Sequence, residues 1–235
     1  MLSVRDEGSR GRIGSFKIAA WPRRALLLAL LAALCVHFGS RPLAAEPIRI
    51  VAFGDSLMAG YGLSDSNAFP AKLEAALKAK GHDVRVANAG VSGDTASAGL
   101  ARLDWSIPDG VDAVIVELGA NDALRAIDPA VTRKSLDAII RRLKERRIDV
   151  LVAGMHAPRN LGSDYVTAFD RIYPDLAQAH DVPLYPFFLD GVATDSKLNQ
   201  RDGIHPTAAG IDVIVARILP AVEQLIGRVR AKQKG

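Results

Sequence analysis

From Ile48 onward, short apolar runs alternate with segments of helical periodicity, and this alternation restricts the fold more than any other feature of the sequence. Five apolar runs predict strands, over residues 48–53, 83–88, 112–119, 149–155 and 182–187. Five intervening or following segments predict helices, over 69–81, 95–105, 130–147, 163–180 and 205–229. Strict strand-helix alternation is typical of a parallel sheet covered by helices on both faces. We therefore predict one α/β domain over residues 46–235.

Prolines and capping residues sharpen several helix boundaries. Pro70 suits a first helical turn, and Asp128 followed by Pro129 is a helix cap followed by proline at the first helical position. Pro174 lies inside the helical pattern of residues 163–180 and predicts a kink or break there. Pro220 predicts a bend in the last helix.

The first 45 residues have the layout of an export signal. Six arginines and lysines precede the apolar run of residues 25–38, and small residues around Ala45 offer a cleavage site. The run is shorter than the roughly 20 residues that a membrane-spanning helix needs. We expect residues 1–45 to be a cleaved signal peptide and the protein to be periplasmic or secreted. The alternative is an uncleaved N-terminal segment that tethers the protein to the membrane.

Removal of this segment changes the charge of the protein. The whole chain has a formal net charge of +4, but residues 1–45 hold seven basic and two acidic residues, so the remainder carries −1. The basic character of the chain is therefore no sign of a nucleic-acid partner. Cys35 is the only cysteine. The mature chain would lack disulfides and thiolate nucleophiles, and without an H-E-x-x-H motif or a cysteine framework we expect no metal site.

Polar, chemically competent residues follow the predicted strands. In open parallel sheets, ligands bind beyond the carboxyl ends of the strands. The first strand ends in Gly54-Asp55-Ser56, the second in NAGVSGDT (88–95) and the third in ELGANDAL (117–124). A fourth segment, DGIHP (202–206), precedes the last helix. The order of strands and polar segments predicts a single site at this edge of the sheet.

Ser56, His205 and Asp202 together suit nucleophilic catalysis. A serine hydroxyl needs an adjacent base, usually histidine, which a third group orients. Asp202 lies three residues before His205, so a turn can bring its carboxylate to the imidazole, and Pro206 fits the first turn of the last helix. Each residue also has an ordinary interpretation, since Ser56 could be a helix cap and Asp202 a turn residue.

Three groups are candidates for stabilising the negative oxygen of a tetrahedral intermediate. They are the backbone N–H of Ser56, the N–H-rich turn at Gly93 and the side-chain amide of Asn121. Gly93 and Asn121 are individually also common turn residues.

Taken in order, the four segments resemble the SGNH or GDSL-type hydrolase family. GDSLM (54–58) lacks the second glycine of the G-x-S-x-G elbow, which argues against an ordinary α/β-hydrolase. The resemblance implies a flavodoxin-like three-layer αβα fold with about five parallel strands. It implies that Ser56 is the nucleophile, His205 the base and Asp202 its partner, with Ser56, Gly93 and Asn121 as oxyanion donors and no cofactor. The similar branch contains periplasmic thioesterase/protease/lysophospholipase enzymes and bacterial arylesterases.

The expected activity is hydrolysis of carboxylic ester or acyl thioester bonds of small molecules through an acyl-enzyme on Ser56, with arylesters, acyl-CoA and lysophospholipids as the candidate substrates. The alternatives are a carbohydrate or cell-wall O-acetyl esterase with the same triad, and a non-catalytic flavodoxin-like binding module. Loops 123–129 and 155–165 are the predicted pocket walls. The predicted pocket residues are Asp55, Leu57, Leu124, Ala157 and Pro158. His156 is either a loop residue facing water or a group that supports the site.

Overall fold

The computed structural model describes residues 46–234, and the predicted signal peptide lies outside this range. A five-stranded parallel sheet has the order β2-β1-β3-β4-β5. The strands are β1 (Ile48–Gly54), β2 (Val84–Gly90), β3 (Ala113–Glu117), β4 (Asp149–Ala153) and β5 (Leu184–Tyr185). β2 lies on one side of β1, and β3 and the later strands lie on the other side, so the strand order reverses after β2. The resulting switch point, between β1 and β3, is where such sheets bind ligands.

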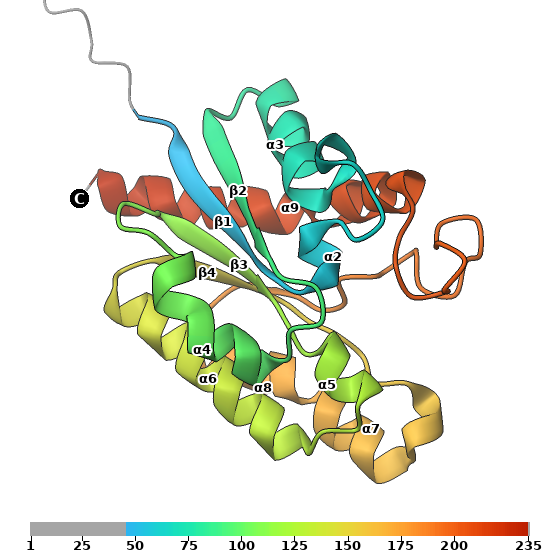
Figure 1. Cartoon of the computed structure of the whole chain (residues 1–235). Coiled ribbons are helices and arrows are strands. Elements are labelled where there is room, and N and C mark those ends of the chain that lie inside the picture. Colours follow the sequence, from blue (N-terminus) through green and yellow to red (C-terminus); the bar gives the residue numbers. More distant parts are fainter. Residues whose placement is uncertain (1–45, 235) are drawn as a thin grey trace, which may run out of the picture. The chain divides into compact units, whose positions relative to one another are not determined.

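Helices cover both faces of the sheet (Figure 1). One face carries α3 (Phe69–Ala79) and α9 (Ala208–Gln233), and the other carries α4 (Ala96–Ser106), α6 (Pro129–Glu145), α7 (Ser163–Asp170) and α8 (Ile172–His180). These layers form because each helix has one apolar stripe. In α6, for example, Leu136, Ile139, Ile140 and Leu143 are buried at helical spacing while the arginines and lysines of the helix face water.

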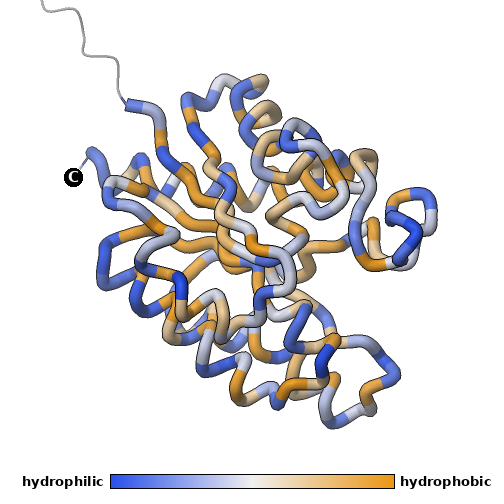
Figure 2. The backbone as a smooth tube through the Cα atoms, in the orientation of Figure 1, coloured by the Kyte–Doolittle hydropathy of each residue, from blue (hydrophilic) through white to orange (hydrophobic). Residues whose placement is uncertain are grey.

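The central strands are buried on both sides, which explains their continuous apolar sequences. All five residues of β3 are buried, and in β1 only Arg49 is exposed. Figure 2 shows the strands as a hydrophobic centre surrounded by helices with mixed surfaces. Gly54 pairs with both Gly90 and Glu117, so the carboxyl ends of β1, β2 and β3 lie at the same level. The polar segments that follow these strands are thereby brought together.

The alternation of strands and helices is confirmed, and the differences are local. Two short helices that we did not predict, α2 (Ser56–Ala59) and α5 (Ala120–Leu124), follow β1 and β3. The predicted strand 182–187 shrinks to the two residues of β5. Among the helices of the described residues, none is both long enough and apolar enough to cross a membrane.

The helices near Pro174 and Pro220 differ in detail from the prediction. The break between α7 and α8 falls at Arg171, three residues before Pro174, because a proline lacks the N–H that would bond to the preceding turn and its ring clashes with that turn. Pro174 itself lies in the first turn of α8, where proline is tolerated. The helix α9 continues through Pro220.

The prediction that the last helix begins at 205 is wrong. The helix begins at Ala208, where Thr207 caps it by accepting a hydrogen bond from the N–H of Gly210. His205 and Pro206 therefore lie in the loop before the helix, and Pro206 bridges to Asn199 instead.

Candidate active site

Ser56, His205 and Asp202 form a continuous chain of hydrogen bonds. Nε2 of His205 lies 2.9 Å from Oγ of Ser56, and Nδ1 of His205 lies 2.7 Å from Oδ2 of Asp202. A turn makes this arrangement possible, because Oδ1 of Asp202 also accepts from the backbone N–H groups of Ile204 and His205. With the proton on Nδ1, the lone pair on Nε2 faces the serine hydroxyl. The three side chains can therefore transfer a proton from Ser56 to His205.

The Asp202 carboxylate is held in its charged form. The hydrogen bond with the His205 ring, followed by the two backbone N–H bonds, lowers the pKa of Asp202 to about 2. An ionised partner at Nδ1 stabilises the imidazolium that forms when His205 takes a proton. Tyr61 packs against the other side of this histidine, with ring centroids 4.4 Å apart. The imidazole orientation is thus constrained by both polar and aromatic contacts.

The backbone N–H groups of Ser56 and Gly93 are donors of the kind that an oxyanion hole uses, although Gly93 does not line the cavity described below. Among the residues that the structure describes, neither the N–H of Ser56 nor that of Gly93 donates a hydrogen bond. Ser56 is the first residue of α2, where backbone N–H groups have no partner within the helix. Gly93 has φ of +88°, a conformation that glycine adopts without strain. Both groups can donate to a negative oxygen.

Asn121 is also brought to the site, but its amide is already engaged. Its Nδ2 donates to Oδ2 of Asp55 and to the backbone carbonyl of Asp94, both at 3.0 Å. The bond to a carboxylate is the stronger of the two, because charge-assisted hydrogen bonds exceed neutral ones. The Asn121 hydrogen that is bonded to the Asp94 carbonyl is therefore the one that an oxyanion can also accept.

Arg102 fixes the loops that carry the oxyanion groups. It is buried beneath them in α4, and its Nε donates to Oδ2 of Asp94 at 2.6 Å. Its Nη2 donates to the carbonyl of Gly54 at 2.8 Å, and its Nη1 donates to the carbonyl of Ala89 at 2.9 Å. One guanidinium thereby ties the ends of β1 and β2 to the loop after β2. Its planar set of donors suits such multiple contacts.

The Asp122 carboxylate also holds separate segments of the site together, next to Asn121 in the chain. Its Oδ2 accepts from the backbone N–H of Ala96 at 2.9 Å, and its Oδ1 accepts from Oγ1 of Thr132 at 2.8 Å. These bonds connect α5 to the starts of α4 and α6. The position of Asn121 is therefore set by buried contacts of the residue that follows it.

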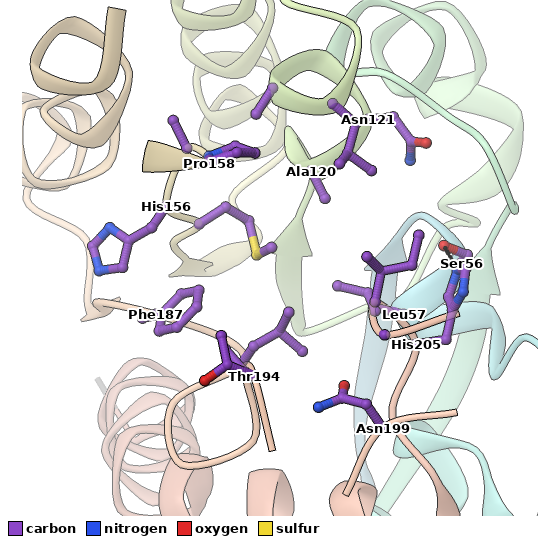
Figure 3. A pocket seen from close by; sticks show the side chains of 18 of the residues that line it. Ser56, Leu57, Ala120, Asn121, His156, Pro158, Phe187, Thr194, Asn199 and His205 are labelled. Atoms are coloured by element: carbon purple, nitrogen blue, oxygen red, sulfur yellow. Dashed lines mark hydrogen bonds between the residues drawn. The ribbon is translucent and has the colours of Figure 1, made fainter. Parts of the chain in front are cut away.

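An apolar cavity of about 460 Å³ opens beside Ser56 and His205. Figure 3 shows these two side chains at one end of the cavity, with His156 and Phe187 across from them. The apolar lining includes Leu57, Leu124, Met155, Ala157, Pro158 and Phe187. Its volume lies in the range of small-molecule binding sites. Leu57, Leu124, Ala157 and Pro158 thus lie where the sequence placed them, in the pocket wall.

Asp55 does not lie in the pocket wall. Its side chain is fully buried and does not line the cavity. It caps α2 instead, with Oδ1 accepting from the N–H of Leu57 at 3.0 Å. This cap turns the carboxylate back under the nucleophile rather than outward to a substrate. The capping role that Ser56 could have played thus belongs to its neighbour.

Asp170 is a supporting residue that we did not predict from the sequence. Its Oδ1 accepts from the backbone N–H of Ala157 at 2.9 Å, and its Oδ2 accepts from Nη1 of Arg159 at 2.7 Å. Nδ1 of His156 lies 3.3 Å from the same oxygen. His156 also contacts the Phe187 ring, with centroids 4.5 Å apart, and it lines the cavity while its side chain stays exposed to water.

We also did not predict a role for Glu117 or Arg102 from the sequence, although the sequence does carry a signal for Glu117. Glu117 is an acidic residue at the end of a run that is otherwise apolar, and a charge in a strand buried on both faces needs a special environment. Arg102 lies in an unremarkable amphipathic helix. Its role depends on contacts with three separate segments.

The fold and this site define a serine hydrolase of the GDSL type. The model of the GDSL-like lipase/acylhydrolase family matches residues 52–213, and the chain belongs to this family. The matched range contains every residue of the triad and of the candidate oxyanion hole.

Individual relatives agree with this assignment. Esterase TesA of Pseudomonas aeruginosa is 37% identical over 204 residues, which cover 86% of this chain and 100% of the relative. Thioesterase 1/protease 1/lysophospholipase L1 of Escherichia coli K12 is 42% identical over 167 residues, which cover 71% of this chain and 78% of the relative. The crystal structure of AlinE4, an SGNH-hydrolase family esterase, is 49% identical with a TM-score of 0.65, covering 77% of this chain and 97% of that one.

Proposed function

We propose that this chain is a serine esterase and thioesterase that hydrolyses small acyl compounds through an acyl-enzyme on Ser56. The observation that carries the proposal is the hydrogen-bonded chain from Asp202 through His205 to Ser56, which ends at an apolar cavity. The names of the relatives, which include esterase, thioesterase and lysophospholipase, support the same reaction class.

The reaction follows from the positions of these groups. Oγ of Ser56 attacks the acyl carbon while its proton passes to Nε2 of His205, and a C–O⁻ tetrahedral intermediate forms. The N–H groups of Ser56 and Gly93, with the Asn121 amide, donate to that oxygen. The bond to the leaving alcohol or thiol breaks as His205 returns the proton to it. Water then attacks the acyl-enzyme with His205 again as base, which releases the acid and restores Ser56.

The cavity supports an acyl group longer than acetyl. Its wall beside Ser56 is apolar, and each methylene buried there contributes about 0.8 kcal/mol, or roughly fourfold in kcat/KM. We therefore expect kcat/KM for p-nitrophenyl butyrate to exceed that for the acetate by about tenfold. The measurement is a series of acetyl, butyryl, octanoyl and palmitoyl p-nitrophenyl esters together with the matching acyl-CoA thioesters. A maximum at acetyl with a sharp loss at butyryl would contradict the proposal and favour an O-acetyl esterase.

A substitution in the cavity wall tests whether this space holds the acyl chain. Ala157 is buried in the wall, and Ala157→Leu fills part of the cavity. We expect kcat/KM for the octanoyl ester to fall by about tenfold or more, while the value for the acetyl ester changes by less than about threefold. Ala75→Leu, on the exposed face of α3, is the matched control and should change neither value. Equal loss for both esters would show that the acyl chain lies elsewhere.

We also propose that the protein is exported and that residues 1–45 are removed. The basic residues, apolar run and small residues before Glu46 support this proposal. When the full chain is produced in a Gram-negative host, we expect the intact mass of the protein from the periplasmic fraction to correspond to a chain that begins at Glu46. A chain that begins at Met1 and sediments with membranes would instead indicate an uncleaved N-terminal tether.

A further inference from the structure

Two acidic side chains are fully buried directly beneath the nucleophile. Asp55 precedes Ser56, and Glu117 is the last residue of β3, paired in register with Gly54 of β1. The backbone N–H of Asp55 points to Oε2 of Glu117 at 3.4 Å. The mechanism described above uses neither carboxyl group. Buried carboxyl groups are costly to keep, so a pair of them at an active site calls for a role.

The chain is built so that the Glu117 carboxyl can approach the backbone closely. A Cβ atom added at Gly54 would lie 2.4 Å from the Glu117 carbonyl oxygen and 2.6 Å from its Oε2. Any side chain at position 54 would therefore displace the carboxyl. Glycine in the GDSL segment leaves the space that Glu117 occupies.

The two carboxyl groups differ in their hydrogen bonds. Asp55 accepts from the N–H of Leu57 at 3.0 Å and from Nδ2 of Asn121 at 3.0 Å, so both of its oxygens are satisfied. Oε1 of Glu117 is buried and has no partner among the residues that the structure describes. An ionised carboxylate with so little solvation would be strongly disfavoured, whereas a neutral acid would not. These contacts favour a charge on Asp55 and a proton on Glu117.

The electrostatics of the pair agree with that distribution. Burial raises the pKa of Asp55 to about 6, although the hydrogen bonds from Leu57 and Asn121 oppose the rise. Burial, and then the charge of Asp55, raise the pKa of Glu117 well above its usual range. Neighbouring buried carboxyl groups do not both ionise readily, so these effects agree with a charge on Asp55 and a proton on Glu117.

We propose that Asp55 and Glu117 act together as a positioning pair, sharing one proton beneath Ser56 and presenting a single negative charge that holds Asn121 for oxyanion binding. The proposal rests on the function proposed above for Ser56 and Asn121. The charged Asp55 oxygen anchors one hydrogen of the Asn121 amide. The second hydrogen of the Asn121 amide is bonded to the neutral Asp94 carbonyl, with Nδ2 3.0 Å from the carbonyl oxygen. Because this bond is the weaker of the two, its hydrogen can also bond to the reacting oxygen.

The proton on Glu117 limits the charge at this point. If Glu117 also ionised, a second negative charge would lie close to the oxygen on which charge develops in the reaction. A second charge there would oppose the negative charge that develops on the intermediate and would lower the rate. The pair therefore predicts a fall in kcat at alkaline pH, where Glu117 loses its proton. The ionisable and charged groups that surround the pair are His205, Asp122 and Tyr173, with Arg102 donating to the carbonyl of Gly54.

Glu117→Gln tests the shared proton. Glutamine keeps the size and a donor toward Asp55 but has no proton to lose. We expect the alkaline decline of kcat, taken relative to the value of the same variant at pH 7, to disappear. In infrared spectra of the wild type at pH 7, we expect the C=O band of a buried neutral carboxylic acid. This band should disappear on raising the pH over the same range in which kcat falls, and it should be absent from Glu117→Gln.

Two further variants separate positioning from stability. Asp55 accepts with both oxygens, from the Leu57 N–H and from Asn121, whereas asparagine has one acceptor oxygen and no charge, so Asp55→Asn should lower kcat by about tenfold to a hundredfold while circular dichroism stays unchanged. Asp149→Asn is the matched control, since Asp149 is a largely buried carboxylate at the opposite end of the sheet, bonded to Lys232 at 2.7 Å. It should keep both the infrared band and the alkaline decline.

The proposal is overturned if the wild type lacks the neutral-acid band at pH 7, or if Glu117→Gln retains either the band or an unchanged alkaline decline. The wild-type titration decides the matter even if a variant fails to fold. The infrared band does not depend on which residue is the nucleophile, so failure of the Ser56 assignment would be seen separately, as loss of serine labelling.

Discussion

Ser56→Ala should lower kcat for p-nitrophenyl butyrate by at least about 10³-fold, because the change removes the oxygen that forms the acyl-enzyme. The residual rate would come from substrate binding and from the oxyanion donors, which the substitution leaves in place. Ser56 is the first residue of α2, and alanine is a good helix former, so we expect no loss of folding. The measurement is steady-state kinetics with circular dichroism as the test of folding.

A second serine provides the control for this experiment. Ser66 lies exposed in a short 3-10 helix, η1 (Asp65–Asn67), where its hydroxyl forms a hydrogen bond with that of Ser64. Ser66→Ala should retain wild-type kcat. A Ser56→Ala variant that kept more than about a tenth of the activity would exclude Ser56 as the nucleophile.

His205→Ala should have an effect of similar size, at least about 10³-fold in kcat, because it removes the base whose Nε2 lies 2.9 Å from Oγ of Ser56. The wild-type pH profile supplies a second sign of the same role. Protonation of Nε2 removes the lone pair that accepts the Ser56 proton, so kcat/KM should fall as the pH is lowered from neutral. Asp202 does not contribute to this fall, because its pKa of about 2 keeps it ionised throughout.

The control for the histidine is His82, which precedes β2 and therefore lies at the opposite edge of the sheet from Ser56, with its Nε2 3.0 Å from Oε1 of Glu223. His82→Ala should leave both kcat and the acid side of the pH profile unchanged. If the wild-type kcat/KM were flat from acid to neutral pH, the assignment of His205 as the base would be wrong.

The sheet and its helices could be predicted because periodicity is a local property. The apolar run around Val114 requires a strand buried on both faces, and the stripe through Leu136 and Ile140 requires an amphipathic helix. Parallel strands then place their carboxyl ends at one edge, which brings Ser56 near Asn121 and the loop of His205 without any knowledge of side-chain packing.

The parts that could not be predicted depend on contacts between distant segments. Asp55 is an acidic residue in a turn, and a polar turn residue ordinarily faces water or ligand. Its burial follows from Glu117, which lies 62 positions away and meets it only through the pairing of β1 with β3. The roles of Arg102 and Asp170 likewise depend on loops that each side chain joins. The start of α9 was misplaced because both Pro206 and Thr207 are good helix-start residues, and the capping contact of Thr207 decides between them.

The most direct test of the account is to locate the covalent adduct of an organophosphonate inhibitor. An alkyl p-nitrophenyl phosphonate would be incubated with the purified enzyme, and the labelled peptide would be identified by mass spectrometry. The account predicts a single adduct on Oγ of Ser56, formed in step with the loss of esterase activity and absent from Ser56→Ala. Inactivation accompanied by an adduct on another residue, with Ser56 unmodified, would contradict it.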